Sequence, residues 1–439
     1  MKKSTLRLLL CLLISVTMSA KANTLLYDED GRRLDFYLNF ATATFFGDNA
    51  YFGESENVYG ANLDDWTEVA FELGFSGETP LGGGALFSEV TGIYTQTWGD
   101  DASGLTVGLS STHEFDLEQA HLGWRSGNTF ESLDKDALTI RYGHFDYLVG
   151  SGILLADGNS DGGERGGWWL GARRTFRNSF LATLESGEWK AEGFYLENKA
   201  RFDGVEGHGY GANFEYGFVE AGLNTGLLYI KIPNQTQSDG DFIGHHSWAL
   251  RADWASTPEL SFSGEYIYQS RYSGTHPKGW FLKGAYRWND TGWTPELSYR
   301  YAHFDGDDLS TNANEEFATI AYGFTDYGTW YQGEITGNYP LGNNNLKSHM
   351  VRLQLFPNDK ITVNTIYYNF TLDQPNIFGD PVGTTDWGDE VNLMLDYSIN
   401  NHWSLSGVFS WLVPGEAARN WTGGDKTWVY GMIYVSFSL

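Results

Sequence analysis

Apolar and polar side chains alternate along the chain in one segment after another, from residue 34 to the last residue. In residues 67–75, 210–218 and 280–288, every second side chain is mostly apolar or aromatic, and those between are mostly small, polar or charged. Successive side chains of a β-strand point to opposite faces of the sheet, so each segment has one apolar face and one mixed face. No helical stretch of note interrupts the pattern. The alternation therefore predicts an all-β protein with two unlike sheet faces.

The composition indicates what those two faces meet. Beyond the first residues we find no run of 18 apolar residues, so no transmembrane helix is predicted. The chain nevertheless contains 54 Gly, 17 Trp, 26 Tyr and 28 Phe. A membrane barrel has an apolar face toward lipid and a water-filled lumen. Each of its strands therefore contains both apolar and polar residues, and its mean hydropathy is moderate. A soluble β-sandwich, the alternative, has no need of so many strands.

The connections between the segments alternate in length. Short turns, such as those at 257–258, 357–359 and 400–401, exchange with loops at 45–65, 147–168, 231–244, 305–314, 372–386 and 413–425. Short turns on one side and long loops on the other are typical of outer-membrane barrels. We therefore predict a transmembrane antiparallel up-and-down β-barrel of 18–20 strands, with short periplasmic turns and long extracellular loops, as a single domain over residues 23–439.

Residues 1–22 have the features of a secretory signal peptide. Lys2, Lys3 and Arg7 precede an apolar stretch at 8–18, and a small-x-small cleavage motif follows at 20–22. We predict cleavage after Ala22 and export to the outer membrane of a Gram-negative bacterium. The single cysteine, Cys11, leaves with the signal, so a disulfide or a cysteine-bound metal is not expected.

The net charge excludes one class of partner. Without the four basic signal residues and with no acidic ones lost, the formal charge of −28 becomes −32. A nucleic-acid partner is disfavoured at that charge. The acids concentrate in predicted loops, at 28–30, 305–308 and 380–389, where they predict a solvated, cation-attracting outer surface.

The last strand carries a second localisation signal. Apolar or small residues from Val429 to Phe437 and Leu439 alternate with mostly polar or aromatic ones. An amphipathic last strand ending on an apolar residue resembles the signal read by the barrel-assembly machinery. This strand must also pair with the first one, predicted near residues 34–43, because an open sheet edge cannot persist in lipid. The expected surroundings are outer-membrane lipid and lipopolysaccharide.

The C-terminal half resembles the alginate-export family of outer-membrane porins. The matching stretches are 298–307, 327–334, 353–357, 367–370, 389–397, 412–415 and the final strand. The resemblance is good over residues 280–439 and weaker over 137–200. It implies a monomeric barrel of about eighteen strands. Its best-known members pass an anionic polysaccharide through an arginine-rich lumen.

Basic residues opposite the apolar face are the candidates for a substrate path. They are Arg125, Arg141, Arg251, Lys283, Arg287, Arg300 and Arg352. A guanidinium group binds a carboxylate through two parallel hydrogen bonds, which a uronate-passing pore would use. Acidic residues share the same face, namely Glu68, Glu72, Glu265, Glu334 and Asp396, and Glu334 joins the path candidates. Two interpretations stay open: an anion-binding ladder, or a lattice of inward Arg–Glu pairs that satisfies the wall.

The glycine-rich loop at 147–168 contains a partial calcium motif. Asp157, Asn159 and Asp161 have the spacing of the first half of a calcium loop. The position that requires a bidentate glutamate holds Trp168, so a glycine-rich constriction or surface loop is the alternative. Loop-bound calcium is the single cofactor considered.

Other metal or catalytic sites are not predicted. His245 and His246 lie near Asp241, and His113 is near His121, but neither pair has the spacing of a closed metal site. No Ser, His and Asp set has a local catalytic signature, so an enzyme is not expected. The leading hypothesis is a channel for passive movement of an alginate-like anionic oligo- or polysaccharide. The alternatives are a porin for another small or hydrophobic nutrient and a structural or adhesive barrel.

Overall fold

The computed structural model describes residues 23–198, 207–233, 245–321, 323–324 and 332–439. Within these residues, 18 strands form one closed antiparallel barrel in which each strand pairs with its neighbours in the chain. The predicted fold class and strand number are therefore confirmed. The predicted signal peptide at 1–22 and Asp241 lie outside the described residues.

The strands are long and their bounds follow the alternating segments. The barrel consists of β2 (Arg32–Asp48), β3 (Trp66–Leu81), β4 (Gly84–Trp98), β5 (His113–Arg125), β6 (Leu138–Phe145), β7 (Phe176–Ser186), β8 (Trp189–Asn198), β9 (Gly207–Phe218), β10 (Leu223–Ile232), β11 (His245–Ala255), β12 (Leu260–Ser270), β13 (Lys278–Arg287), β14 (Glu296–Phe304), β15 (Leu346–Asn358), β16 (Ile361–Leu372), β19 (Asp386–Ser398), β20 (Trp403–Pro414) and β21 (Trp428–Ser438).

Short elements lie outside the barrel wall. They are β1 (Thr24–Glu29), the two-residue strands β17 (Asn376–Ile377) and β18 (Asp380–Pro381), the helices α1 (Ala50–Gly53), α2 (Ser55–Tyr59) and α3 (Glu416–Thr422), and the 3-10 turns η1 (Gly163–Arg165) and η2 (Val219–Ala221). None of the described helices has the length and apolar character needed to cross a membrane.

The barrel closes between its first and last strands. Residues 39–48 of β2 pair with residues 429–438 of β21, with Phe40 opposite Phe437. The predicted pairing of the last strand with the first is confirmed, and residues 39–43 of the predicted stretch take part in it, while β1 occupies the start of that edge, where Thr24 lies opposite Phe36. The N-terminal hairpin therefore continues the sheet beyond the end of the last strand.

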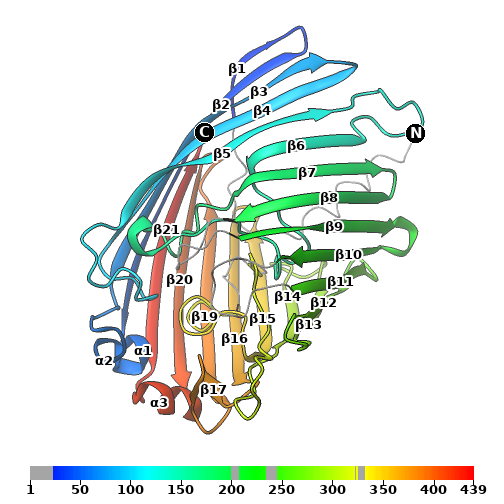
Figure 1. The fold of residues 1–439 in the computed structure, drawn as a ribbon. Coiled ribbons are helices and arrows are strands. Elements are labelled where there is room, and N and C mark those ends of the chain that lie inside the picture. The colour runs from blue at the N-terminus through cyan, green and yellow to red at the C-terminus, as the bar shows by residue number, and fades with distance from the viewer. Residues whose placement is uncertain (1–22, 199–206, 234–244, 322, 325–331) are drawn as a thin grey trace.

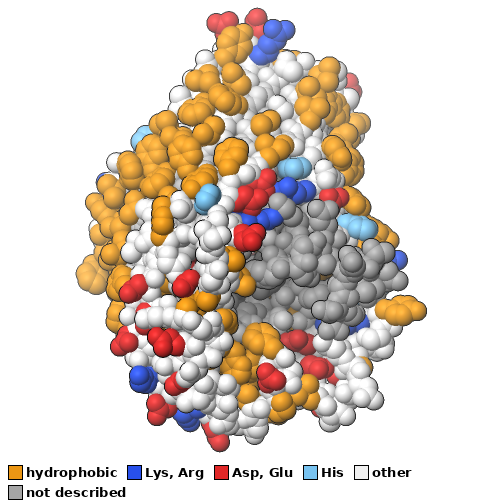
Figure 2. All heavy atoms as spheres, turned by 60° about the vertical axis from the view of Figure 1, so that its left-hand side comes forward, with side chains coloured by type: hydrophobic (Ala, Val, Ile, Leu, Met, Phe, Trp, Pro, Cys, Tyr) orange, Lys and Arg blue, Asp and Glu red, His pale blue; other side chains and the backbone are white. Residues whose placement is uncertain are grey.

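The two faces of the wall have the predicted composition. Trp288, Val351 and Leu353 are 40%, 42% and 39% exposed, and Trp280 contacts the outward ring of Tyr301. The residues between them on these strands point inward and many are buried. Hydrophobic side chains are spread over the barrel wall, and acidic side chains are scattered over the loop-bearing end (Figure 2). The outer face is thus suited to lipid.

The two ends of the barrel differ in their connections. Turns such as Gly82-Gly83, with φ of 61° and 84°, join strands at one end, where both residues need the left-handed conformation that glycine adopts. The helices α1, α2 and α3 and the β17–β18 hairpin lie at the other end, the lower end in Figure 1. By the usual asymmetry of such barrels, the short-turn end is periplasmic.

Two long connections fold into the barrel instead of projecting from it. Their described residues are 146–175 for the first and 305–321, 323–324 and 332–345 for the second, so both extend beyond the predicted loops at 147–168 and 305–314. Ile153, Leu154 and Phe317 are almost fully buried in them. Burying such side chains stabilises by roughly 1.5–3 kcal/mol each, which explains why these apolar stretches leave the solvent. We call these segments the first and second inner loops.

Candidate substrate path

The two inner loops meet each other inside the barrel. Leu155 and Ala321 form a parallel β-bridge. The Ala156 N–H donates to the Ala321 carbonyl at 2.6 Å, and the Gly323 N–H donates to the Gly152 carbonyl at 2.7 Å. Backbone hydrogen bonds therefore couple two segments that are far apart in the sequence.

Glycine lets the first inner loop approach the wall closely. Gly150 has a φ of +61°, and a Cβ there would lie 2.7 Å from Cδ of Arg251 and 3.0 Å from Oε2 of Glu265. Any other residue would be strained by the positive φ, and its Cβ would clash with Arg251 and Glu265. The glycine-rich composition of this loop follows from its seat against the inner wall.

Inward carboxylates hold the first inner loop through its backbone. Glu68, on β3, accepts the Trp169 N–H at 3.1 Å and the Leu170 N–H at 2.9 Å. Glu118, on β5, accepts the N–H groups of the next turn, at Arg174 and Thr175, at 2.6 and 3.1 Å. We call these carboxylates wall anchors.

Glu265 and Glu390 are wall anchors of the same kind. Glu265, on β12, accepts both the N–H and the hydroxyl of Ser151, at 3.2 and 2.6 Å. Glu390, on β19, accepts the Ile335 and Thr336 N–H groups of the second inner loop, each at 2.9 Å. The wall therefore fixes both loops at several heights. Alternation predicted that Glu68 and Glu265 point inward, but it could not reveal their backbone partners.

Glu334, predicted on a strand, lies instead in the second inner loop. Its side chain is fully buried, and Oε2 accepts the indole N–H of Trp169 at 3.4 Å. Burial raises the pKa of Glu334 to about 8, and the nearby charge of Glu390 adds to the shift. This carboxyl group joins the second inner loop to the first.

Four of the predicted basic residues come together on three neighbouring strands. Lys283 and Arg287 lie on β13, Arg300 on β14 and Arg352 on β15, with Lys283 opposite Arg300 in the register. We call these four residues the basic patch. One carboxylate, Glu296, lies between two of them. It forms ion pairs with Arg287 at 2.8 Å and with Arg352 at 2.9 Å. Two of the four basic residues therefore share one carboxylate.

Members of the basic patch differ in their access to the lumen. The Arg287 side chain is 37% exposed, whereas that of Arg352 is 6% exposed. Arg300 is fully buried beneath the second inner loop: its guanidinium lies 4.4 Å from the Phe324 ring and donates to Gln332 at 3.1 Å. The alternation of side chains predicted that Arg300 points inward. No feature of the sequence predicted the loop that covers it.

The remaining predicted cations are distributed along other strands. Arg251, on β11, contacts Glu215 at 2.6 Å and Asn213 at 2.5 Å. Arg141, on β6, lies 4.0 Å from the Phe145 ring. Arg125, on β5, forms an ion pair with Glu78. The inner wall thus combines one basic patch with a lattice of paired charges elsewhere.

The acids Glu72 and Asp396 also point inward. Glu72 accepts the Asn39 amide at 2.9 Å, and Asp396 accepts the Ser406 hydroxyl at 2.6 Å. Both contacts join neighbouring strands. These two carboxylates are therefore part of the hydrogen-bonded wall.

The proposed calcium ligands bind other groups of the protein. Asp161 forms an ion pair with the buried Arg173 at 2.7 Å. Asn159 accepts a hydrogen bond from Arg165 at 3.0 Å, and Asp157 accepts the Asn159 N–H at 3.1 Å. The three side chains thus stabilise the first inner loop with contacts of their own.

The histidine pairs do not converge on a shared metal position. His245 is buried inside, while His246 contacts the Tyr229 hydroxyl at 2.6 Å on the outer face. His113 and His121 are eight residues apart on one strand. Among the described residues, the one His/Asp/Glu group that is compact enough for a metal is His303, Asp305 and Asp373. Lys347 already neutralises this group by binding Asp373 at 2.7 Å.

Aromatic rings cover the inner wall on the side of β2, β3 and β21. Phe45 stacks on Trp66 with 4.2 Å between ring centroids, and Trp66 also contacts Tyr430 and Tyr339. Trp169 of the first inner loop packs against Phe45. The barrel interior therefore has an aromatic region in addition to its basic patch.

Comparisons with known proteins agree with this architecture. A family model described as alginate export matches residues 169–430. The fold is similar to a BenF-like porin from Pseudomonas fluorescens Pf-5, with a TM-score of 0.60 and 14% identity, covering 92% of this chain and 98% of that chain. It is also similar to Pseudomonas aeruginosa OpdK with vanillate, with a TM-score of 0.57, 13% identity, and coverage of 93% and 98%. No curated protein matches the chain.

Proposed function

The chain belongs to the alginate-export family, and on this premise we propose that it is a passive outer-membrane channel for short anionic saccharides. The cargo class is a uronate oligomer of one or a few rings. Membership and fold support an outer-membrane porin. The finer proposal rests on the inner wall and on the two inner loops.

The basic patch is the observation that carries the proposal. Two of its cations, Arg287 and Arg352, share the carboxylate of Glu296, and Arg287 is the most exposed of the three residues in that ion-pair group. A passing carboxylate can bind such a group and leave it again, because each arginine exchanges one carboxylate for another. A pore requires binding that is strong enough for entry and weak enough for release.

The inner loops support short cargo over a full-length polymer. Both loops lie inside the barrel, are bonded to each other and are held by wall anchors. A segment that is fixed at several heights reduces the cross-section available to a solute. A stiff polysaccharide would have to displace these contacts along its whole length.

Liposome swelling with purified protein tests this proposal. Potassium uronates from a single ring to long oligomers are supplied outside the liposomes. We expect rapid entry for the shortest members and a steep fall with length. Equal entry of long oligomers would contradict the role of the loops, and no entry of any uronate would refute the cargo class. A heat-modifiable, folded protein band serves as the control for each preparation.

A second candidate is uptake of small aromatic carboxylates. It is favoured by the aromatic region around Trp66 and Tyr430, and by similarity of fold to OpdK, whose structure contains vanillate. The same swelling assay separates the two. Faster entry of benzoate-type acids than of uronates of similar charge would favour this second candidate.

A further inference from the structure

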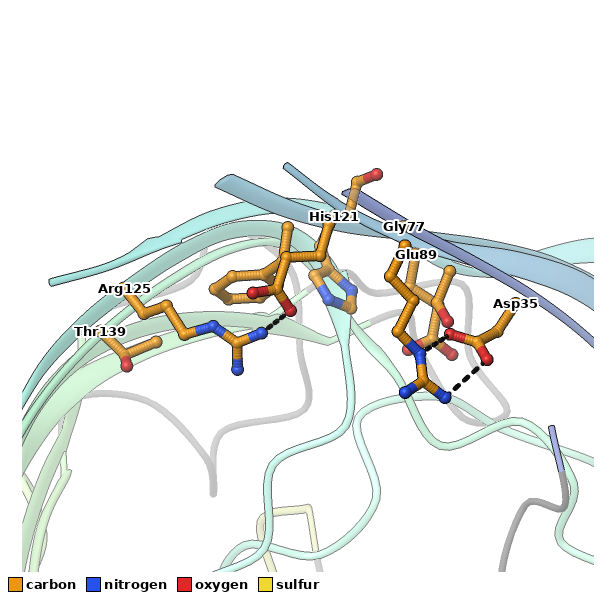
Figure 3. A pocket seen from close by; sticks show the side chains of 11 residues that line it. Asp35, Gly77, Glu89, His121, Arg125 and Thr139 are labelled. Carbon is orange, nitrogen blue, oxygen red and sulfur yellow. Dashed lines mark hydrogen bonds and ion pairs between the residues drawn. The ribbon is translucent and has the colours of Figure 1, made fainter. Parts of the chain in front are cut away.

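A cavity of about 270 Å³ opens on the inner wall at the short-turn end of the barrel. Strands β2 to β6 form it, so it lies on a different part of the sheet from the basic patch. The side chains that matter for its chemistry are Arg33, Asp35, Glu78, Phe87, Arg125 and Thr139. Arg125 and Thr139 lie at one side and Asp35 at the other, with His121 between them (Figure 3). Its size is below the roughly 300–1,000 Å³ of drug-sized sites and suits a single ring.

An aromatic ring forms part of the cavity surface because glycine makes room for it. Phe87 lies opposite Gly123 in the register of β4 and β5. A Cβ at position 123 would lie 2.2 Å from Cζ of Phe87, so the ring needs glycine there. The Arg125 guanidinium lies 5.7 Å from the ring centroid. The ring presents an apolar surface between polar groups.

The charged groups around this ring already have partners. Arg33 binds Asp35 through two contacts, at 2.5 and 2.8 Å, and Arg125 is paired with Glu78. The third carboxylate, Glu89, accepts the Tyr37 hydroxyl and lies close enough to Arg141 to interact with its charge. Two guanidinium groups of the lining therefore face three carboxylates.

We propose that this cavity binds one pyranose ring of a saccharide through its hydroxyl groups, at the periplasmic mouth. Hydroxyls can donate to carboxylates and accept from guanidinium groups without adding a charge to the cavity. The carbon face of a sugar ring can lie on Phe87, which is apolar. An added carboxylate would meet three acids whose cations are already paired, so recognition by charge is disfavoured. The proposal goes beyond the proposed function, since its ligand is an uncharged pyranose ring and not a uronate, and it adds a site separate from the basic patch.

Ligand-observed NMR on the folded, full-length barrel in detergent tests the site. The probes are methyl α-D-mannopyranoside and, as a ring with a carboxylate but no hydroxyls, cyclohexanecarboxylate. We expect saturable pyranoside binding that falls at least about fivefold in Phe87→Ala. The matched control is Phe356→Ala, since Phe356 also lies beside an arginine, Arg287, at 4.8 Å. That variant should bind the pyranoside like the parent.

A milder variant keeps the test valid if Phe87→Ala does not fold. Thr139→Val preserves shape and removes one hydroxyl, and we expect a smaller loss of pyranoside binding. The proposal is overturned if the parent does not bind the pyranoside, or if Phe87→Ala and Phe356→Ala weaken binding equally. It is also overturned if cyclohexanecarboxylate binds more tightly than the pyranoside in a Phe87-dependent manner.

Failure of the pyranose site can be distinguished from failure of the proposed channel function. Uronate entry into liposomes with no Phe87-dependent pyranoside binding would refute this site and leave the channel proposal standing. Phe87-dependent binding without any saccharide entry would refute the channel proposal and leave the site standing.

Discussion

At the scale of single residues, the inward carboxylates bind backbone groups of the inner loops. Glu68 lies about one hundred positions from its partners in the sequence, 101 from Trp169 and 102 from Leu170. Alternation reports the face of a side chain and nothing about such distant contacts. The direction of Glu68 was therefore predictable, while its role as a wall anchor was not. The same holds for Arg300, which points inward as predicted and is covered by Phe324.

Removing one wall anchor should loosen one inner loop. In Glu390→Gln, the side chain keeps one acceptor oxygen for the two N–H groups of Ile335 and Thr336. A buried N–H without a partner costs about 1–3 kcal/mol. We expect larger and more frequent current fluctuations in single-channel recordings. Glu315→Gln is the control, because Glu315 accepts only the exposed Thr311 hydroxyl among its described side-chain contacts, and it should record like the parent. A quiet Glu390→Gln channel would refute the anchoring role.

The docking of the second inner loop inside the barrel should weaken as the pH rises. Burial raises the pKa of Glu334 to about 8, so the docked loop favours the protonated carboxyl group. The contribution of Glu334 to the stability of the docked loop is complete below the usual carboxyl pKa. It is lost as the pH rises through about 8, by about 1.4 kcal/mol per pH unit between those two values. Current fluctuations should therefore increase from pH 5 to pH 9. Glu334→Gln should flatten this dependence, and an unchanged profile would contradict it.

At the scale of elements, strands were predictable and the inner loops were not. The lipid-facing side of each strand must be apolar, whatever residues face the lumen. Every second residue is therefore apolar, and this alternation is visible in the sequence. The second inner loop carries aromatic and apolar residues such as Phe317 and Ile335, which are buried against the inner wall. Such composition does not distinguish a loop in the lumen from a strand in the wall. The inward rings of Tyr368 and Phe370 on β16 illustrate the same ambiguity.

The depth of a residue along β21 should set the cost of a charge on its outer face. Ile433 is 52% exposed and lies near the middle of the strand, whereas Phe437 is at its end and packs on Trp403. Ile433→Lys should cost roughly 2–4 kcal/mol, and Phe437→Lys roughly 0–1 kcal/mol. Urea or guanidinium unfolding in lipid vesicles measures both. Equal costs would place the membrane at a different height on this strand.

At the scale of the whole molecule, a closed barrel supports two fixed inner loops and a wall with separate charge regions. The closed sheet satisfies the backbone of every membrane-crossing strand, which lipid requires. Its outer loops hold many of the acids of this acidic chain, and water screens those charges beyond roughly 8–10 Å. The basic patch lies inside, where screening is weaker. The local charges of the wall, and not the net charge, should therefore decide which ions pass.

The reversal potential in planar bilayers under a potassium chloride gradient tests this account most directly. The parent channel should prefer anions, because four basic residues lie on three neighbouring strands of the inner wall, two of them bound to Glu296. Replacing Arg287 and Arg352 together with serine should shift the reversal potential toward cation preference, and Glu296→Gln should shift it the other way. A parent channel that prefers cations, or a double variant with the same reversal potential as the parent, would contradict the proposed path for anionic solutes.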